Sequence, residues 1–414
     1  MRYHSRPVTV KVPDISGVRT PLPFQTRTEM ANHCYKLNQS FRDTTYFDTV
    51  NHQKWASTYL LALAFHQIGN SNLWRMLEVE AMQVIRLLEV HHIVSYAGLD
   101  VIEAQLRKKA FWLMFYDYIH QLHNLRNERI MYLDHVILRD IKLEDLMPAP
   151  LDDEYITSNG IATCPEDVAA NSLTAGFNIH SRIFAAALEA PGVLFNFPCS
   201  CARPQESQSQ DTNVKEQLHH LKHMLDTLPP AYRPWNKKAT LIESTPEHKD
   251  VGDVQREAIR VNIHVTHLWL QSIMLDRIDA IAEEQQLLAF SPHGSGDRLA
   301  LGSGSSPSLQ SIAPHSTSWD KREDICRQLL YSLHSFSHSA LEPNGLSLVY
   351  KVRDVAVPLL ACPDERERRA KEYLSEFASL LSVLDVNQKA NSLILQSWID
   401  TSRDKSITSL PTQD

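Results

Sequence analysis

Apolar residues recur at steps of three and four along much of this chain of 414 residues. The clearest example is the segment 73–92, whose apolar positions are Leu73, Met76, Leu77, Ala81, Val84, Ile85 and Leu88. Residues at these steps share one face of a helix, which must be buried against another element. No two neighbouring segments alternate as paired strands do, and only 12 glycines are available for tight turns. The sequence therefore predicts an all-α protein, built as a multi-helix bundle or an array of helical hairpins.

Glycine, proline and short polar residues indicate where the predicted helices begin and end. A nearly continuous apolar helix over residues 54–69 is expected to stop at Gly69 and Asn70, and Ser71 or Asn72 is expected to cap the next helix. Further helices are predicted over residues 100–123, 176–190, 214–228, 255–290, 321–337, 347–361 and 364–398, with a proline-rich loop over 145–155.

Composition changes along the chain and predicts a series of regions. Residues 1–50 contain Pro13, Pro21 and Pro23, which interrupt long elements, so this part is expected to be an N-terminal extension. Residues 291–318 are rich in Ser, Gly and Pro and are expected to be a disordered insertion. The other regions are a helical regulatory core at 51–200, a polar linker at 201–213, a continuing helical region at 214–290, C-terminal helices at 319–400 and a tail at 401–414.

The segment 107–120, RKKAFWLMFYDYIH, places three cations before seven apolar residues. Seven are too few to cross a bilayer, which takes about 18. The net charge of −8 opposes nucleic acid, and no basic run is longer than these three cations. We therefore expect Arg107 to pair with a carboxylate such as Glu103 one turn earlier. The aromatic face is expected to lie in the core and consists of Trp112, Phe115 and Tyr116 together with Ile119.

Cysteine usage favours a reducing compartment. The six cysteines are scattered over positions 34 to 362, which is not the pattern of a disulfide framework. The first residues contain no apolar stretch typical of a signal peptide. An intracellular protein is the expectation from these features.

The chain contains 20 histidines, which are possible metal ligands. His219, His220 and His223 have helical spacing that can hold a metal ion, but neighbouring lysines favour a solvated helix face. His264 and His267 lie in an apolar helix and are expected to be satisfied core histidines.

Three other features of the sequence bear on possible catalytic or metal sites. His91 and His92 are placed at the end of the helix 73–92, where a positive charge suits the helix dipole. Cys199 and Cys201 lack further ligands at zinc spacing. No nucleophile elbow, phosphate loop or metalloprotease motif is present. We therefore expect no catalytic, cofactor-binding or metal-binding residues and no enzyme activity.

Acidic, basic, aromatic and proline residues of the middle of the chain follow one another in a recognisable order. They are Glu103, Arg107, Lys108, Lys109, Phe111, Trp112, Phe115, Asp117, Pro148, Pro150, Asp152 and Asp153. This order resembles the middle homology region of fungal-specific transcription factors. The resemblance covers residues 45–190, and the segment 341–363 is similar to the C-terminal part of such regulators.

The resemblance implies a regulatory domain that modulates transcription, with the nucleus as its location and the cytoplasm as the alternative. Two departures accompany it. Residues 125–129, LRNER, stand where the family has a Gly-Arg-Pro turn, and only Cys34 precedes Cys164, whereas family members generally carry an N-terminal cluster of six zinc-binding cysteines. Direct DNA binding by this chain is therefore not expected. Implied partners are a DNA-bound regulator or co-regulator, a small-molecule effector, or a further copy of the chain, and no membrane.

Two alternative functions remain open from the residues alone. Stacked helical hairpins also form adaptor or scaffold proteins that have no role in transcription. No repeat of 30 to 50 residues supports that architecture here. An enzyme with an unrecognised site is the other alternative.

Overall fold

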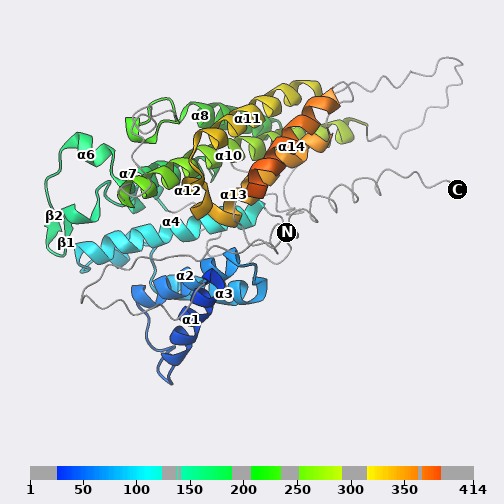
Figure 1. The fold of residues 1–414 in the computed structure, drawn as a ribbon. Coiled ribbons are helices and arrows are strands. Elements are labelled where there is room, and N and C mark those ends of the chain that lie inside the picture. The colour runs from blue at the N-terminus through cyan, green and yellow to red at the C-terminus, as the bar shows by residue number, and fades with distance from the viewer. Residues whose placement is uncertain are drawn as a thin grey trace, which may run out of the picture. The chain divides into compact units, whose positions relative to one another are not determined.

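The structure is a computed structural model that describes residues 26–123, 138, 141–188, 207–234, 251–290, 315–361 and 366–383. Within these residues the regular elements are almost all helices, which confirms the all-α prediction (Figure 1). The described residues form two compact units, with the division of the chain after Cys164.

The described part of the first unit contains four α-helices, and a polar side chain caps the start of each. The helices are α1 (Arg27–Ser40), α2 (His52–Gln67), α3 (Ser71–Leu87) and α4 (Val101–His123). The Thr26 hydroxyl and the Glu29 carboxylate form a reciprocal capping box at the start of α1. Asn51 caps α2, and Asn70 caps α3 by accepting from the amide of Leu73 at 3.3 Å. The cap of α3 is thus Asn70 and not Ser71 or Asn72, because Ser71 is already helical. At α4 the Oδ1 of Asp100 accepts from the Glu103 amide at 2.9 Å.

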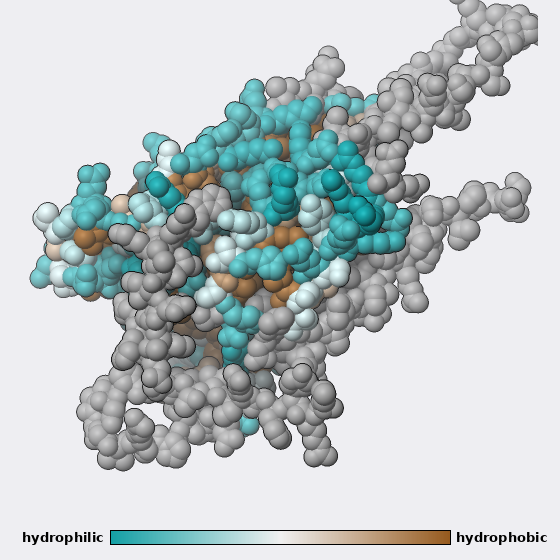
Figure 2. All heavy atoms as spheres, turned by 45° about the horizontal axis from the view of Figure 1, so that its top comes forward, coloured by the Kyte–Doolittle hydropathy of each residue, from teal (hydrophilic) through white to brown (hydrophobic). Residues whose placement is uncertain are grey.

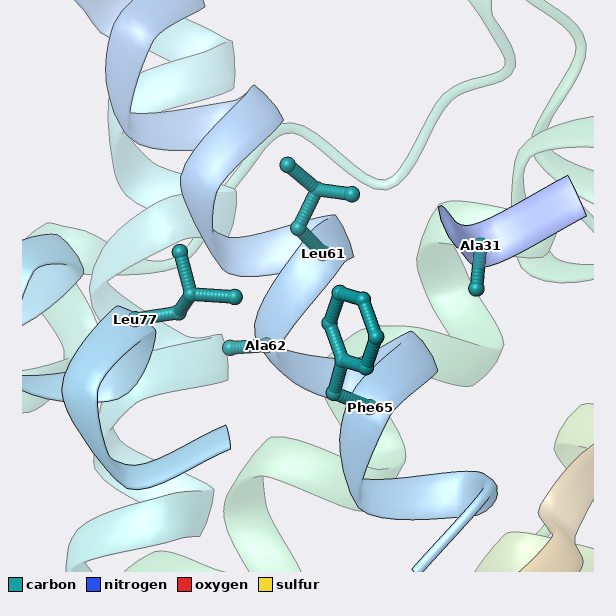
Figure 3. Close-up of a cluster of buried hydrophobic side chains, with 5 residues drawn as sticks. All are labelled: Ala31, Leu61, Ala62, Phe65 and Leu77. Carbon is teal, nitrogen blue, oxygen red and sulfur yellow. The ribbon is translucent and has the colours of Figure 1, made fainter. Parts of the chain in front are cut away.

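Helices α1, α2 and α3 share an apolar cluster (Figure 3). The side chains of Leu61, Ala62 and Phe65 on α2 lie between Ala31 of α1 and Leu77 of α3. Residues 27–40, within the predicted N-terminal extension, thus form a helix that contributes to the core. The pair Thr26 and Glu29 was the sequence signal for it, because Thr-x-x-Glu is a capping box.

The end of α3 differs from the prediction. The helix stops at Leu87, and Glu89 has a φ of 51°, the left-handed conformation that ends helices. His91 and His92 lie beyond this reversal and not at the helix end. The predicted apolar stripe is buried at Leu77, Ala81, Val84, Ile85 and Leu88. Met76 is instead 69% exposed.

The described residues 141–161 contain only short elements, in agreement with the proline-rich loop predicted over 145–155. Single 3₁₀ turns span Leu143–Leu146 (η2) and Asp153–Tyr155 (η3), and another, η1 (Ile93–Tyr96), precedes α4. A hairpin of two residues per strand, β1 (Ile156–Thr157) and β2 (Gly160–Ile161), pairs Ile156 with Ile161. The expectation that there would be no sheet is corrected by this small hairpin, which was too short to give a detectable alternation.

The second unit is arranged around α10 (Val251–Phe290), whose described side chains from Arg260 to Leu275 are buried except for Asn262. It packs against α7, α8, α11, α12 and α13. These helices, with the short α6 and the last helix α14, span Glu166–Ala170 (α6), Leu173–Leu188 (α7), Ser207–His223 (α8), His315–Ser335 (α11), His338–Leu341 (α12), Gly345–Ala356 (α13) and Glu367–Val383 (α14). The described part of the unit also contains the 3₁₀ turns Pro230–Tyr232 (η5), Glu342–Asn344 (η7) and Val357–Ala361 (η8). The central part of α10, from Arg260 to Leu275, is therefore the core of this unit.

Several boundaries in the second unit differ from the predicted ones. The expected core at 51–200 crosses the division at Cys164, because α7 packs on α10 and so belongs with the later helices. The expected linker at 201–213 is helical from Ser207, and the expected insertion at 291–318 includes the first turn of α11 from His315. Residues 201–206, 291–314 and the predicted helical residues 384–398 lie outside the described part. The α-helix expected to reach residue 361 ends at Ala356, because Pro358 follows.

The described surface has the composition expected of amphipathic helices. On the face drawn in Figure 2, hydrophilic residues predominate and smaller hydrophobic groups lie between them. None of the described helices combines the length and hydropathy needed to cross a membrane.

Candidate functional site

The basic start of α4 is held by ion pairs and hydrogen bonds. The Nε of Arg107 lies 2.7 Å from the Oε1 of Glu103, so the predicted pair is confirmed. Lys109 is 3.4 Å from Asp153, whose side chain is 93% exposed, so this ion pair is weak. Arg107 and Lys109 thus have acidic partners within the same chain.

The middle of α4 is tied to the proline-rich segment through backbone groups. The indole Nε1 of Trp112 donates to the Leu146 carbonyl at 3.0 Å, and Lys108 Nζ donates to the Asp145 carbonyl at 2.8 Å. The Oε1 of Gln105 accepts from the Ala149 amide at 2.7 Å. We call this set, Gln105, Lys108 and Trp112 with residues 145–149, the α4 junction. Its hydrogen bonds join residues 34 to 44 positions apart in the chain, and all three side chains belong to α4.

The other residues of the family pattern lie around this junction. Phe111, Trp112, Phe115 and Ile119 are fully buried, whereas Tyr116 is only half-buried. Pro148 is buried, Asp117 and Asp152 are half-buried and Pro150 is exposed. The segment LRNER at 125–129 lies outside the described residues.

The histidines of α10 are core residues, as predicted. His264 Nε2 donates to the Tyr232 carbonyl at 2.8 Å, and His267 Nε2 donates to the Leu221 carbonyl at 2.6 Å. Burial lowers the pKa of each to about 4, which keeps both rings neutral near pH 7. Their role is to satisfy the carbonyls of neighbouring elements.

Of the remaining candidates, those that the structure describes are histidines at the surface of α8. His219, His220 and His223 are exposed on α8, where His223 pairs with Asp226 at 2.9 Å. Among the described residues there is no group of three or more His, Cys, Asp or Glu that could hold a metal ion. Cys199 and Cys201 are outside those residues, and Cys34, Cys164 and Cys326 are free thiols.

A cluster that the sequence did not predict lies where three helices of the second unit meet. Lys351 on α13 is only 4% exposed, and its Nζ lies 2.7 Å from the Oγ1 of Thr266 on α10. The same oxygen lies 2.9 Å from the Nε2 of His180 on α7. We call Lys351, Thr266 and His180 the buried lysine cluster.

The walls of this cluster are aromatic. Lys351 Nζ lies 5.5 Å from the ring centroid of Phe184 and 5.6 Å from that of Trp269. A cation gains some attraction from such rings, but much less than it loses by leaving water. Burial accordingly lowers the pKa of Lys351 to about 7. Burial and the nearby Lys351 charge hold the pKa of His180 well below its usual value.

The two distances define a consistent hydrogen-bonded chain. With His180 neutral, Lys351 donates to Thr266, and the Thr266 hydroxyl donates to the Nε2 of His180. The nearest acid in sequence on α13, Asp354, instead accepts from the indole of Trp269 at 3.1 Å and pairs with Arg353 at 3.0 Å. The cluster therefore contains an amine, a hydroxyl and an imidazole but no carboxylate.

A signal for Lys351 was present in the sequence. Leu348, Val352 and Val355 are buried at three- and four-residue steps on α13, and Lys351 falls on the same stripe. A lysine on a buried stripe is rare and calls for a partner. Neither Thr266 nor His180 could be assigned as that partner, because both are about 85 residues or more from it in the chain.

No protein family, no curated protein and no solved structure matches this sequence.

Proposed function

We propose that this chain is the regulatory domain of a transcription regulator of the fungal-specific family and that it modulates transcription through a protein partner or a small effector. The observation that carries the proposal is the α4 junction. The family resemblance rests on residues of α4 and of a proline-rich segment about forty residues later, and these two parts are hydrogen-bonded to each other here. Contact between these two parts gives a physical reason for the order and spacing of the residues in the family pattern.

The arrangement of charges supports a partner-mediated role. The net charge is −8, and the cations Arg107, Lys108 and Lys109 are engaged with groups of the same chain. These residues are poorly suited to phosphate contacts, which DNA binding requires. We therefore propose a nuclear protein that reaches promoters through a DNA-bound regulator.

The test is a tethering experiment. The chain is fused to an unrelated DNA-binding module and directed to a reporter promoter, and transcription is compared with that given by the module alone. We expect a change in reporter output, in either direction. The variant Trp112→Ala should reduce that change, because it removes the buried side chain at the α4 junction, whereas the matched variant Lys109→Ala should leave it intact.

Two results would contradict the proposal. One is reporter output equal to that of the DNA-binding module alone, with the fusion protein expressed at a normal level. The other is exclusion of a fluorescently tagged chain from the nucleus under all growth conditions tested.

A further inference from the structure

We propose that Lys351 is a site of reversible carbamylation by carbon dioxide, with Thr266 and His180 as the partners of the carboxylate that forms. This inference concerns the second unit and does not depend on the proposed role in transcription.

The first support is the state of the amine. An amine reacts with carbon dioxide only when it carries a lone pair, and exposed lysines are almost entirely protonated near pH 7 because their pKa is about 10.4. The 4% exposure of Lys351 and the absence of a carboxylate in the buried lysine cluster favour its neutral form. The pKa of about 7 agrees with this.

The second support is the identity of the neighbours. A carbamate is an anion with two oxygens, and it needs hydrogen-bond donors in a dry site. Thr266 offers a hydroxyl within 2.7 Å of the amine nitrogen, and His180 offers a ring nitrogen 2.9 Å further along. Thr266 can thus donate to the carbamate once His180 has taken up a proton.

The reaction is balanced without any further reagent. The Nζ lone pair attacks the carbon of carbon dioxide, a C–N bond forms, and one C–O π pair moves onto oxygen. The nitrogen then loses one proton to Thr266 Oγ1, while the hydroxyl proton passes to His180 Nε2. The net result is a carbamate on Lys351 and an imidazolium on His180.

The charges favour this transfer. A positive Lys351 lowers the pKa of His180, together with burial. Carbamylation converts the neutral, reactive amine into an anion, and a neighbouring negative charge favours the imidazolium form of His180. The two new charges form a pair joined through Thr266, which is the condition under which buried charges persist.

The reagent suits a site this deeply buried. Carbon dioxide is small and has no net dipole, so it enters apolar interiors as other small apolar molecules do. It adds one carbon and two oxygens to the side chain. The rings of Phe184 and Trp269 lie 5.5 and 5.6 Å from the amine, so the surroundings that carbon dioxide would meet are largely apolar.

The test uses the full chain with isotopically labelled bicarbonate, at about one pH unit above the Lys351 pKa of about 7. We expect one labelled carbamate resonance that disappears when carbon dioxide is removed. Trapping with a trialkyloxonium reagent followed by peptide mapping of the wild-type protein should place the label on Lys351, without any variant that needs to fold.

Variants then sharpen the assignment. Lys351→Met should abolish the resonance, and the control Lys371→Met, at an exposed lysine paired with Glu367, should retain it. Thr266→Val should lower the occupancy at a given bicarbonate concentration about tenfold, the equivalent of one charge-assisted hydrogen bond. No label on Lys351 at saturating bicarbonate, or a resonance that persists in Lys351→Met, overturns the proposal. Unchanged occupancy in Thr266→Val overturns the role of the threonine.

Discussion

The two units bury different kinds of side chain. In the first unit the fully buried residues of α4 are mainly aromatic. Lys108 and Trp112 of this helix donate hydrogen bonds to the backbone carbonyls of Asp145 and Leu146. In the second unit α10 buries Arg260, His264, Thr266, His267 and Gln271 within its apolar surface. Most of the exposed large apolar side chains also belong to the first unit, such as Phe41, Phe47 and Met76. Stability of the first unit should therefore depend on packing, and that of the second on how buried polar groups are paired.

The largest expected effect tests the packing of the first unit. Trp112→Ala removes a fully buried ring and the donor to the Leu146 carbonyl. We expect a loss of about 3–5 kcal/mol in the free energy of unfolding, measured by chemical denaturation. Hydrogen exchange should show the loss first in residues 141–155. Trp112→Phe is the control that keeps most of the volume and should cost about 1–2 kcal/mol through the unpaired carbonyl. Equal losses for the two variants would show that packing is not the dominant contribution.

The second prediction concerns the polar interior of the second unit and is tested by the pH dependence of the free energy of unfolding. The pKa of Lys351 is about 7 in the folded chain and 10.5 when unperturbed. Between these values the unfolded chain binds a proton that the folded chain does not, so stability rises with pH. From pH 7 to pH 9 the gain should be about 2 kcal/mol, because the full slope of roughly 1.4 kcal/mol per unit is reached only once the folded-state amine is deprotonated.

The matched variant for this pH dependence is Lys351→Met. It should be more stable than the wild type near pH 7 and should lack this part of the slope. The measurement is urea denaturation across the pH range in buffers free of carbon dioxide. A wild-type slope identical to that of Lys351→Met would show that the amine is not titrating in this window.

The third prediction concerns close packing beside α10. A Cβ built on Gly176 of α7 would lie 2.5 Å from a ring carbon of Tyr232. This ring cannot easily move, because it is fully buried and its hydroxyl bonds to the Ser172 carbonyl. Gly176→Ala should therefore cost about 1–3 kcal/mol through overpacking. The double variant Gly176→Ala with Tyr232→Phe tests whether the tyrosine hydroxyl, the nearest polar atom, contributes to the clash. Thermal unfolding of both variants measures the loss of stability.

The smallest effect is expected at the surface of the first unit. Lys109→Ala removes an ion pair whose acidic partner is 93% exposed. We expect a change below about 0.5 kcal/mol. A loss above about 1 kcal/mol in denaturation at moderate salt would mean that the exposed cations of α4 contribute to stability, which would weaken the contrast between the units.

The sequence predicted the positions of the helices better than it predicted the contacts between them. Helical periodicity located α2, α3 and α4, and the pairing of Arg107 with Glu103 followed from four-residue spacing. Helix α1 was missed because three prolines precede it, although its capping box was visible. The end of α3 was misplaced because Glu89 adopts a left-handed conformation that usually indicates glycine.

The buried lysine cluster could not be predicted for a different reason. Its three members come from α7, α10 and α13, and only the packing of these helices places a hydroxyl between an amine and an imidazole. Periodicity shows that a lysine falls on a buried stripe, but it does not show what faces that stripe. The junction of α4 with residues 145–149 could not be predicted either, because the partners of its three side chains are backbone carbonyls and a backbone amide, which carry no sequence signal.

The position of α10 in the chain has a consequence for synthesis on the ribosome. Its packing partners α7 and α8 are translated before it, and α11 and α13 after it. At about 5–20 residues per second, the earlier helices wait several seconds for the helix that covers their apolar faces. Thr266 and His180 can meet once α10 has emerged, whereas Lys351 follows some 85 residues later. The amine is therefore the last member of its cluster to arrive, and a nascent chain that stalls between residues 290 and 345 would hold a half-covered α10, a natural target for chaperones.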